Sequence, residues 1–297
     1  MGNFAGMAHL TEEIQDFLRK HGFECRIMVQ EGAGFIQVRS DRCCRMVLPV
    51  EICATDVEEA QKLSQRMQQA VDSAASKEEY PLVITEDRWR GMPEMTGSRL
   101  LSHLEVFTPV YARNCEVRRI EKDVAREFLT RNHSYGYAAC RYCYGLFFKR
   151  FTGAGAEELA GSGPEAGQLI AVASFSNARK WLKEGKEIRS YEWTRYASLP
   201  HLRINGGMGK ILKAFIRDVQ PDDIMSYADL EWSEGNVYQQ LGFAEEGNKA
   251  PVCFEVDTSC WKRRSLETPD NEGICRERKD FCNFGSAKYR LKLTEYE

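Results

Sequence analysis

The sequence predicts a mixed α/β protein of the α+β type, built in two parts. Apolar residues recur at helical spacing in some segments and alternate or run continuously in others, as strands do. Segments of both kinds occur along the whole chain, so the protein is expected to combine helices and strands. The chain has 297 residues, 43% of them hydrophobic and 29% charged. This is the composition of an ordinary globular protein with one large or two small domains.

The first part, residues 1–107, is expected to be a small α/β module. Its first helix carries Leu10, Ile14, Phe17 and Leu18 on one stripe, the pattern of an amphipathic helix. The order α-β-β-β-α-β-α is predicted from the following segments: helix 8–21, strands 24–30, 34–39 and 44–52, helix 57–75, strand 82–84 and helix 93–104. The helix at 57 is predicted to start after Thr55-Asp56, residues typical of a helix N-terminus.

The second part, residues 108–297, is expected to hold a larger sheet with helices and a C-terminal extension. Its predicted elements are strand 115–120, helix 121–130, strands 142–148 and 169–174, strand 188–198, helix 209–219, strand 224–229, helix 235–241 and strand 252–256. Residues 152–167 are rich in glycine, alanine and glutamate and are interpreted as a hairpin loop. The tail after Asp257 is polar, and we expect Phe281 and residues 289–293 to dock back onto the protein.

A glycine-rich turn is the most informative local feature. Residues 202–210 read Leu-Arg-Ile-Asn-Gly-Gly-Met-Gly-Lys, between the strand at 191–198 and a helix. Free backbone N–H groups and the positive end of the helix dipole then meet at one place, which suits a pyrophosphate. Ile211 after Gly-Lys excludes a nucleotide-triphosphate loop, and no Gly-x-Gly-x-x-Gly follows a first strand. The alternative is that the glycines only permit a tight turn.

Residues 110–257 resemble the GNAT acyltransferase fold. The segment Arg203-Ile204-Asn205-Gly206-Gly207-Met208-Gly209 is similar to the family's Arg-x-x-Gly-x-Gly/Ala turn, with one additional residue. The segment 236–243, Asn-Val-Tyr-Gln-Gln-Leu-Gly-Phe, is similar to its Tyr-x-x-x-Gly-Phe ending. The resemblance implies a mixed sheet flanked by helices, and acetyl-CoA or another acyl-CoA as the thioester donor. It also implies that Tyr238 faces the thioester sulfur.

The same resemblance implies roles for individual residues. The predicted cofactor-binding residues are Tyr196, Ala197, Ser198, Arg203, Gly206, Gly207, Gly209 and Lys210. Tyr238 is the predicted acid for the departing thiolate, with helix-to-sheet packing as the alternative. Glu192 or Asp229 is the predicted base, its pKa raised by Trp193, Tyr227 and Trp232; the alternative is an ion pair with Arg195 or Arg179. His133, Tyr227 and Trp232 are the predicted substrate-binding residues, although His133 also suits a helix cap.

A narrower resemblance is to phage Mom-like and homing-endonuclease-associated GNAT-like domains. It is carried by Asn132-His133-Ser134, Tyr144-Gly145-Leu146, Ser174-Phe175-Ser176, Arg179 and Ser226-Tyr227-Ala228-Asp229 through Gly242-Phe243. The first module is similar in element order to a restriction-endonuclease core. Because Glu51-Ile52-Cys53 lacks the lysine of a metal-binding set, the resemblance implies a degenerate module without a metal site.

Charge and cysteine content limit the partners. The formal net charge is −3, so bulk electrostatics do not argue for nucleic-acid binding, and the short basic runs suit a solvated surface. No signal pattern or membrane-length apolar run is present in these residues, so we expect a cytoplasmic protein with no membrane partner. The eleven cysteines are then expected to be thiols. Cys140 and Cys143 have the spacing of half a zinc site, for which Cys260, Cys275 or Cys282 would have to complete the ligands; buried thiols are the preferred interpretation.

Two functions are therefore predicted. The first is an acyl-CoA-dependent N-acyltransferase of GNAT type, acting on an amine that could belong to a nucleic-acid base. The second is a non-catalytic GNAT-like protein of a phage or mobile element that binds nucleic acid. The sequence does not specify the acyl group, the acceptor or the oligomeric state.

Overall fold

The chain forms two compact units in a computed structural model that describes residues 4–41, 43–75, 80–150, 163–183, 185–232, 235–266 and 277–296. The first unit comprises 1–100, 228–234 and 248–287, and the second comprises 101–227, 235–247 and 288–297. The chain therefore passes between the units several times. The domain boundary predicted at residue 107/108 stays a prediction, and the predicted loop at 152–167 lies largely outside the described residues.

The first unit contains the predicted N-terminal sheet and its helices. Its elements to residue 103 are α1 (Phe4–Lys20), β1 (Glu24–Gln30), β2 (Ala33–Arg39), β3 (Cys44–Val50), α2 (Val57–Ala74), β4 (Leu82–Thr85), α3 (Glu86–Gly91) and α4 (Pro93–His103). The strand order is β1-β2-β3-β4, with antiparallel pairing up to β3 and a parallel pair of β3 with β4. The predicted order is confirmed, except that the short charged helix α3 was not predicted.

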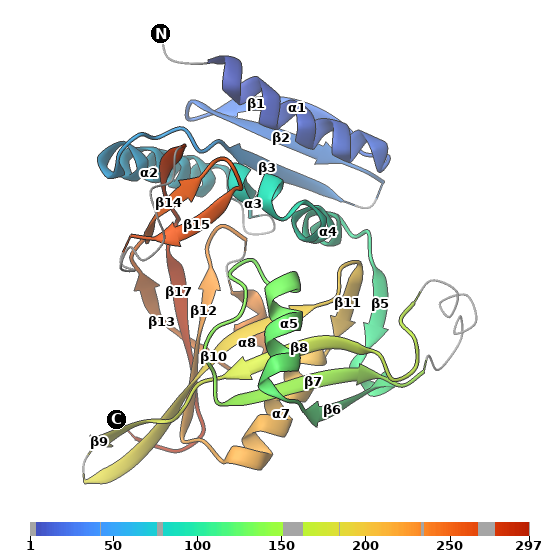
Figure 1. The fold of residues 1–297 in the computed structure, drawn as a ribbon, viewed down its shortest axis with the longest axis vertical. Coiled ribbons are helices and arrows are strands. Elements are labelled where there is room, and N and C mark those ends of the chain that lie inside the picture. The colour runs from blue at the N-terminus through green and yellow to red at the C-terminus, as the bar shows by residue number, and fades with distance from the viewer. Residues whose placement is uncertain are drawn as a thin grey trace. The chain divides into compact units, whose positions relative to one another are not determined.

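The amphipathic stripe of α1 explains how this sheet is covered. Leu10, Ile14 and Leu18 are fully buried, and α1 runs along β1, β2 and β3 (Figure 1). The helix α2 starts at Asp56, whose side chain accepts a hydrogen bond from the amide of Glu59 at 2.8 Å. This is the N-cap geometry that the sequence predicted.

A second, three-stranded sheet of the first unit lies against α2. Its order is β15 (Lys262–Ser265), β14 (Cys253–Asp257) and β16 (Arg278–Cys282). Cys253 and Cys282 face each other in the antiparallel register of β14 and β16 and form a disulfide. The expectation that all cysteines are thiols is therefore wrong for this pair, because strand pairing brings together two cysteines separated by 29 residues.

The second unit is built on one large mixed sheet. Its elements are β5 (Thr108–Tyr111), the 3-10 turn η1 (Ala112–Asn114), β6 (Cys115–Arg119), α5 (Lys122–Asn132), β7 (Tyr142–Phe148), β8 (Leu169–Phe175), β9 (Arg179–Lys183), β10 (Lys186–Ser198), β11 (Leu202–Asn205), α7 (Gly207–Val219), β12 (Asp223–Asp229), α8 (Asn236–Gln240), β13 (Ala244–Lys249) and β17 (Ser286–Lys292). The order is β13-β17-β12-β10-β8-β7-β6, and β9 extends β10 as a hairpin. β17 confirms that the tail docks back.

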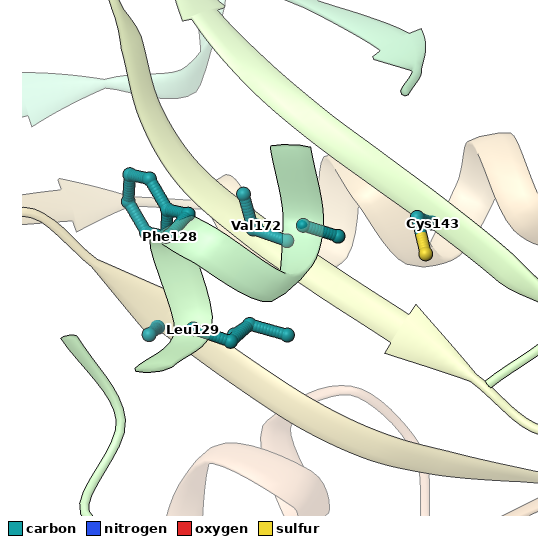
Figure 2. Close-up of a cluster of buried hydrophobic side chains, with 6 residues drawn as sticks. Phe128, Leu129, Cys143 and Val172 are labelled. Atoms are coloured by element: carbon teal, nitrogen blue, oxygen red, sulfur yellow. The ribbon is translucent and has the colours of Figure 1, made fainter. Parts of the chain in front are cut away.

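Two helices cover opposite faces of this sheet (Figure 1). On one face α5 buries Phe128 and Leu129 against Cys143, Val172 and Ala197 (Figure 2). On the other face the Phe215 ring of α7 stacks on Phe175 of β8, with ring centroids 3.9 Å apart. The sheet is thus held between two apolar layers, as expected for a mixed sheet flanked by helices.

The predicted glycine turn is shorter than expected. Residues 202–205 form β11, which pairs in parallel with β5, and α7 already begins at Gly207. Only Gly206 lies between the strand and the helix. In the described part of the chain, no helix combines the length and the apolar character needed to cross a bilayer.

Candidate active site

The central feature of the second unit is a point where two parallel neighbours separate. β10 pairs with β12 only over Ser190–Glu192, opposite Asp223–Met225. From Trp193 onward the register of β10 is with β8 on its other side. The segments after Glu192 and Met225 therefore diverge. From there on, the backbone edge of β10 that faced β12 can form hydrogen bonds with an extended ligand.

Backbone alternation identifies the amides on that edge. The N–H of Leu199 donates to the carbonyl of Ile170, so it points toward β8. Because successive residues of a strand point their N–H and C=O groups to opposite sides, the amides of Tyr196 and Ser198 face away from β8. The side chain of Ala197 joins the core beneath α5. The predicted residues 196–198 thus offer backbone groups rather than side chains to a ligand.

Tyr238 reaches the point of divergence. Its phenol oxygen lies 2.9 Å from Oγ of Ser226, and this serine donates to the carbonyl of Trp193 at 2.9 Å. Ser226 is on β12 and Trp193 on β10, each one residue beyond the last parallel pair. Burial raises the pKa of Tyr238. The phenol is therefore neutral near pH 7 and carries a proton that it can donate.

A stacked tyrosine and a glycine hold Tyr238 in this place. The ring of Tyr289, on β17, lies 5.3 Å from that of Tyr238 at an interplanar angle of 22°. Gly235 precedes α8 with φ of +79°, and a Cβ on it would meet the Tyr289 ring at 2.4 Å. Only glycine suits both the backbone and the space at this position. The segment after Asp257 thus contributes to the site by supporting Tyr238.

The first turn of α7 provides backbone amides and packs against Tyr196 of β10, since a Cβ on Gly207 would lie 3.1 Å from the Tyr196 hydroxyl. The geometry of an α-helix leaves the N–H groups of Gly207, Met208 and Gly209 without an intrahelical acceptor, and the helix dipole adds positive character there. Gly206 precedes the helix with φ of +76°. A Cβ on Gly207 would lie 2.7 Å from Cγ2 of Ile204. The two glycines are thus required by backbone conformation and by close packing.

Gly207→Ala should therefore destabilise the protein by about 1–3 kcal/mol, the usual cost of overpacking. Gly209→Ala is the matched control in the same turn. Its Cβ would meet only the side-chain end of Leu241, at 3.2 Å, and alanine favours a helix over glycine by about 1 kcal/mol. Urea titrations of the two variants test this difference. Equal stability of both would contradict the close approach at Gly207.

Two predicted phosphate-binding cations are placed differently from each other. Nζ of Lys210 donates to the carbonyls of Ala112 and Cys115 at 2.8 and 2.6 Å, so it links α7 to η1 and β6. The Lys210 ammonium is therefore bound to backbone carbonyls and does not extend toward a ligand. The Arg203 guanidinium is exposed and lies over the Phe107 ring, 4.9 Å from its centroid. Of the two side chains, Arg203 is the one that solvent or an anion can reach.

Glu192 lies at the last parallel pair of β10 with β12. Its amide donates to Oγ of Ser176, and its carbonyl accepts from the amide of Ser176, both at 2.9 Å. Its predicted partner Arg195 instead donates to the carbonyls of Gly136 and Thr194. Within the described residues the Glu192 carboxylate forms no ion pair, although its charge opposes the burial that lowers the pKa of Arg195.

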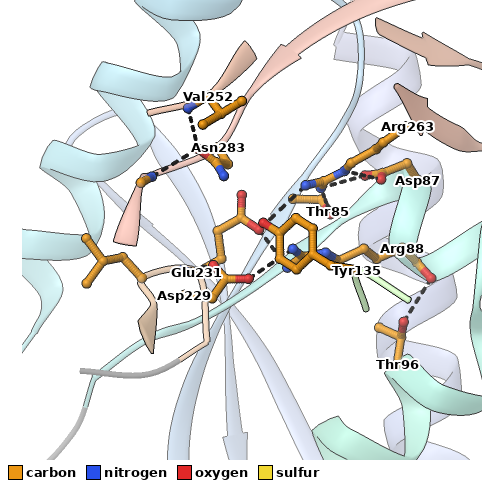
Figure 3. Close-up of polar contacts among 12 residues, drawn as sticks. Thr85, Asp87, Arg88, Thr96, Tyr135, Asp229, Glu231, Val252, Arg263 and Asn283 are labelled. Atoms are coloured by element: carbon orange, nitrogen blue, oxygen red, sulfur yellow. Dashed lines mark hydrogen bonds and ion pairs between the residues drawn. The ribbon is translucent and has the colours of Figure 1, made fainter. Parts of the chain in front are cut away.

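Asp229 belongs to the first unit, where it takes part in a buried ion network. Nη2 of Arg88 lies 3.0 Å from its carboxylate, and Nη1 of Arg88 lies 2.6 Å from that of Glu231 (Figure 3). Burial alone would raise the pKa of Asp229, but Arg88 and the amide of Glu231 lower it overall. The expectation of a raised pKa is therefore wrong, because the cation outweighs desolvation. Asp229 is the anion of an ion pair here.

Trp232 is also part of the first unit. Its side chain is buried, and the guanidinium of Arg99 lies over its ring, 4.4 Å from the centroid. In this arrangement the ring packs in the interior. Its predicted contact with a substrate base would require this packing to open.

The remaining predicted substrate residues lie in the second unit. His133 is the C-cap residue of α5, and its Nδ1 accepts a hydrogen bond from the amide of Tyr135 at 3.1 Å. This is the capping role that the sequence left open. Tyr227 follows Ser226 on β12 and is partly buried. By strand alternation its side chain lies on the sheet face opposite that of Ser226.

Sequence reasoning did not single out Ser226 as a site residue. It stands in the segment Ser226-Tyr227-Ala228-Asp229, in which the sequence pattern points to the tyrosine and the aspartate. The available signal was a small hydroxyl residue inside a buried strand, directly after Ile224 and Met225. Its role depends on Trp193 and Tyr238, which lie 33 and 12 residues away in the sequence.

Comparison with known proteins yields distant likenesses. No protein-family model and no curated protein matches the sequence. The large mixed sheet with its helices is similar to GNAT acetyltransferase structures. The ribosomal-protein-S5-alanine acetyltransferase of Vibrio fischeri has 11% identity and a TM-score of 0.35, over 62% of this chain and 96% of its own. An N-acetyltransferase of Staphylococcus aureus has 11% identity and a TM-score of 0.30, over 60% and 97%.

Eis1 of Mycobacterium abscessus has 14% identity and a TM-score of 0.33, over 48% of this chain. The match spans about a third of Eis1, 34% of its length. These likenesses lend no support to the narrower Mom-like resemblance or to a nuclease-like first module. Because they are distant, the function is argued from the geometry of the site.

Proposed function

We propose that this protein is an acyl-CoA-dependent N-acyltransferase with an amine acceptor. The observation that carries the proposal is the placement of the Tyr238 phenol where β10 and β12 separate, held through Ser226. An extended thioester arm that enters the divergence would pair with the free edge of β10. Its sulfur would then come to the place where the two strands and the phenol meet.

The acyl transfer assigned to this site has balanced steps. An uncharged amine attacks the thioester carbonyl, an amide bond forms, and the carbon–sulfur bond breaks. One backbone amide on the free edge of β10, from Tyr196 or Ser198, would donate to the carbonyl oxygen as negative charge develops. Such a donor contributes about 3 kcal/mol to lowering the barrier. Tyr238 gives its proton to the departing thiolate and regains one from solvent.

The acceptor needs a group that removes its proton. Glu192 suits this role because it lies at the divergence and its carboxylate has no ion pair in the described chain. It could act directly or through one water molecule. Asp229, held by Arg88, is the weaker candidate. The pyrophosphate of the donor would be bound by the first-turn amides of α7, with the exposed Arg203 adding charge.

The finer proposal is that the acceptor amine belongs to a nucleic acid. It is supported by the hairpin of β9 and β10, in which Arg179, Lys180 and Lys183 are exposed together with two apolar residues. Trp181 is 43% and Leu182 is 74% exposed. Cations beside an exposed aromatic ring are typical of surfaces that bind single strands. The same hairpin favours the second candidate function, a GNAT-like nucleic-acid-binding protein without catalysis.

Acetyl-CoA should raise the melting temperature of the protein, because a ligand bound only by the folded state stabilises it. At 100 times the dissociation constant the gain is about 2.7 kcal/mol. A thermal-shift titration measures it, with desulfo-coenzyme A as a check that the pyrophosphate arm and not the acyl group gives most of the binding. Adenosine alone is the control and should shift the melting temperature little.

The same titration separates the two functions. No shift at millimolar acetyl-CoA, together with DNA binding that weakens steeply with salt, would favour the non-catalytic protein. A shift with acetyl-CoA and DNA binding together would support the nucleic-acid acceptor.

A further inference from the structure

Two cysteines of the second unit lie in direct contact. The sulfurs of Cys140 and Cys143 are 3.3 Å apart, and the Tyr137 hydroxyl lies 3.5 Å from the sulfur of Cys140. Cys143 is buried on β7 under α5 (Figure 2). Cys140 is partly exposed and precedes the strand, in a segment without regular structure. One sulfur is thus fixed in the core, and the other can be reached from solvent.

The surroundings of the pair distinguish its members. The charges of Lys122 and Arg126 on α5 act on Cys140, and the Arg126 guanidinium lies over the Tyr137 ring, 5.1 Å from its centroid. The S–H of Cys143, the Tyr137 hydroxyl and these cations lower the pKa of Cys140 to about 6, against the opposing effect of burial. The hydrogen bond to Cys140, burial and the Cys140 charge raise the pKa of Cys143. Cys140 is therefore the thiolate near pH 7, and Cys143 is the thiol.

Other interpretations explain less. Among the described residues no group of three histidine, cysteine or carboxylate side chains could hold a metal ion, so the zinc interpretation has no further ligands there. An inert core cysteine is exemplified by Cys115 of the same unit, whose pKa is raised to about 11, mainly by burial. Cys140 has the opposite environment, with a sulfur, a phenol and two cations around it.

We propose that Cys140 and Cys143 form a thiol–disulfide exchange site for low-molecular-weight disulfides, with Cys140 as the attacking sulfur and Cys143 as the resolving sulfur. The two sulfurs are 3.3 Å apart, which is about 1.3 Å longer than the S–S bond of a disulfide. Movement of the irregular segment before β7 can supply this difference. The site is independent of the proposed acyl transfer, since neither sulfur belongs to the divergence of β10 and β12.

The exchange is balanced in atoms and electrons. The Cys140 thiolate attacks a disulfide R–S–S–R, a mixed disulfide forms, and one R–S⁻ leaves. Cys140 is then neutral, so the charge and hydrogen bond that kept the proton on Cys143 are gone. The Cys143 thiolate attacks the Cys140 sulfur, the intramolecular disulfide forms, and the second R–S⁻ leaves. The cysteine pair is oxidised by two electrons, and the disulfide is reduced to two thiols. One of these thiols takes up the proton released by Cys143, and the other takes up a proton from solvent.

The test uses oxidised glutathione and peptide mass spectrometry of the full chain. Wild-type protein is expected to lose two hydrogens and to yield a peptide cross-linked between Cys140 and Cys143. The existing Cys253–Cys282 disulfide is counted separately in the peptide map. Cys143→Ser is expected to retain one glutathione on Cys140. Cys115→Ser, a buried cysteine in the same unit, is the matched control and should still form the cross-link.

A second measurement needs no variant. Iodoacetamide at pH 6 should alkylate Cys140 about tenfold faster than Cys53. Cys53 is solvent-accessible, but its surroundings desolvate the thiolate and raise its pKa. The larger thiolate fraction of Cys140 outweighs the lower nucleophilicity of a more acidic thiol. The proposal is overturned if wild-type protein gives no Cys140–Cys143 cross-link. It is also overturned if Cys53 reacts faster than Cys140.

Discussion

Replacing Tyr238 with phenylalanine is expected to lower the turnover of acyl transfer by about 100-fold, the lower end of what a positioned general acid contributes. The phenol is the group held where β10 and β12 separate, 2.9 Å from Oγ of Ser226. Phenylalanine keeps the ring and its stacking on Tyr289 but has no proton to give to the thiolate. The KM for acetyl-CoA should change little, since the proposed binding of the donor is through backbone amides and not through this phenol. Steady-state kinetics with a thiol-detecting assay measures both constants.

Tyr289→Phe is the matched control for this experiment. The Tyr289 ring stacks on Tyr238, but its hydroxyl is directed to Glu245 at 3.5 Å, outside the divergence. Its turnover should stay close to that of the wild type. If Tyr238→Phe lowered turnover and cofactor affinity together, Tyr238 would be a packing residue. If it changed neither, another group would protonate the thiolate.

Replacing Arg88 with alanine is expected to destabilise the first unit by about 3–5 kcal/mol. It removes the cation nearest to Asp229 and Glu231, and leaves the buried Glu231 with the more distant Arg263, at 3.9 Å. Arg88 is 3% exposed and lies between Asp229 and the fully buried Glu231 (Figure 3). Urea titration of the full chain gives the change in the free energy of unfolding. Lys62→Ala is the control, since the Lys62–Glu58 pair is exposed and should change stability by less than about 0.5 kcal/mol.

The pH dependence of this loss has a definite sign. Arg88 lowers the pKa of Asp229 below its ordinary value. The stability that the Arg88–Asp229 pair contributes is therefore present above about pH 4 and is lost in acid. Burial raises the pKa of Glu231 despite Arg88 and Arg263, so losing Arg88 costs stability at Glu231 only where this carboxyl group would be ionised. The destabilisation by Arg88→Ala should therefore be larger at pH 7 than at pH 4. Glu231→Gln in the Arg88→Ala background should recover part of the loss at pH 7, and no recovery would contradict the network.

Local pattern was sufficient to predict most elements of both units. Residues 24–30 and 142–148 were predicted as strands with the bounds that the structure has. Helix α1 was predicted from its stripe of leucine and isoleucine. Periodicity works because it depends only on which side of a segment is buried. The short charged helix α3 and the exposed strand β9 have no such pattern and were missed.

The chemical roles of charged residues were harder to predict from the sequence. Lys210 follows a glycine turn and suggested a phosphate ligand, but its ammonium binds two carbonyls about a hundred residues away. Asp229 suggested a base, but its cation stands 141 residues earlier. A side chain's pKa depends on the charges and the burial around it, and these come from segments that are distant in the chain.

By itself the sequence determined the mixed α/β class, the glycine-rich start of α7 and the tyrosine of the segment 236–243, since each follows from local spacing. Only the tertiary structure decided that Ser226 links Tyr238 to Trp193, that β17 enters the large sheet, and that Cys140 contacts Cys143. Strand neighbours and hydrogen-bond partners are chosen by the packing of the whole chain. Local composition constrains that packing but does not encode which distant residues meet.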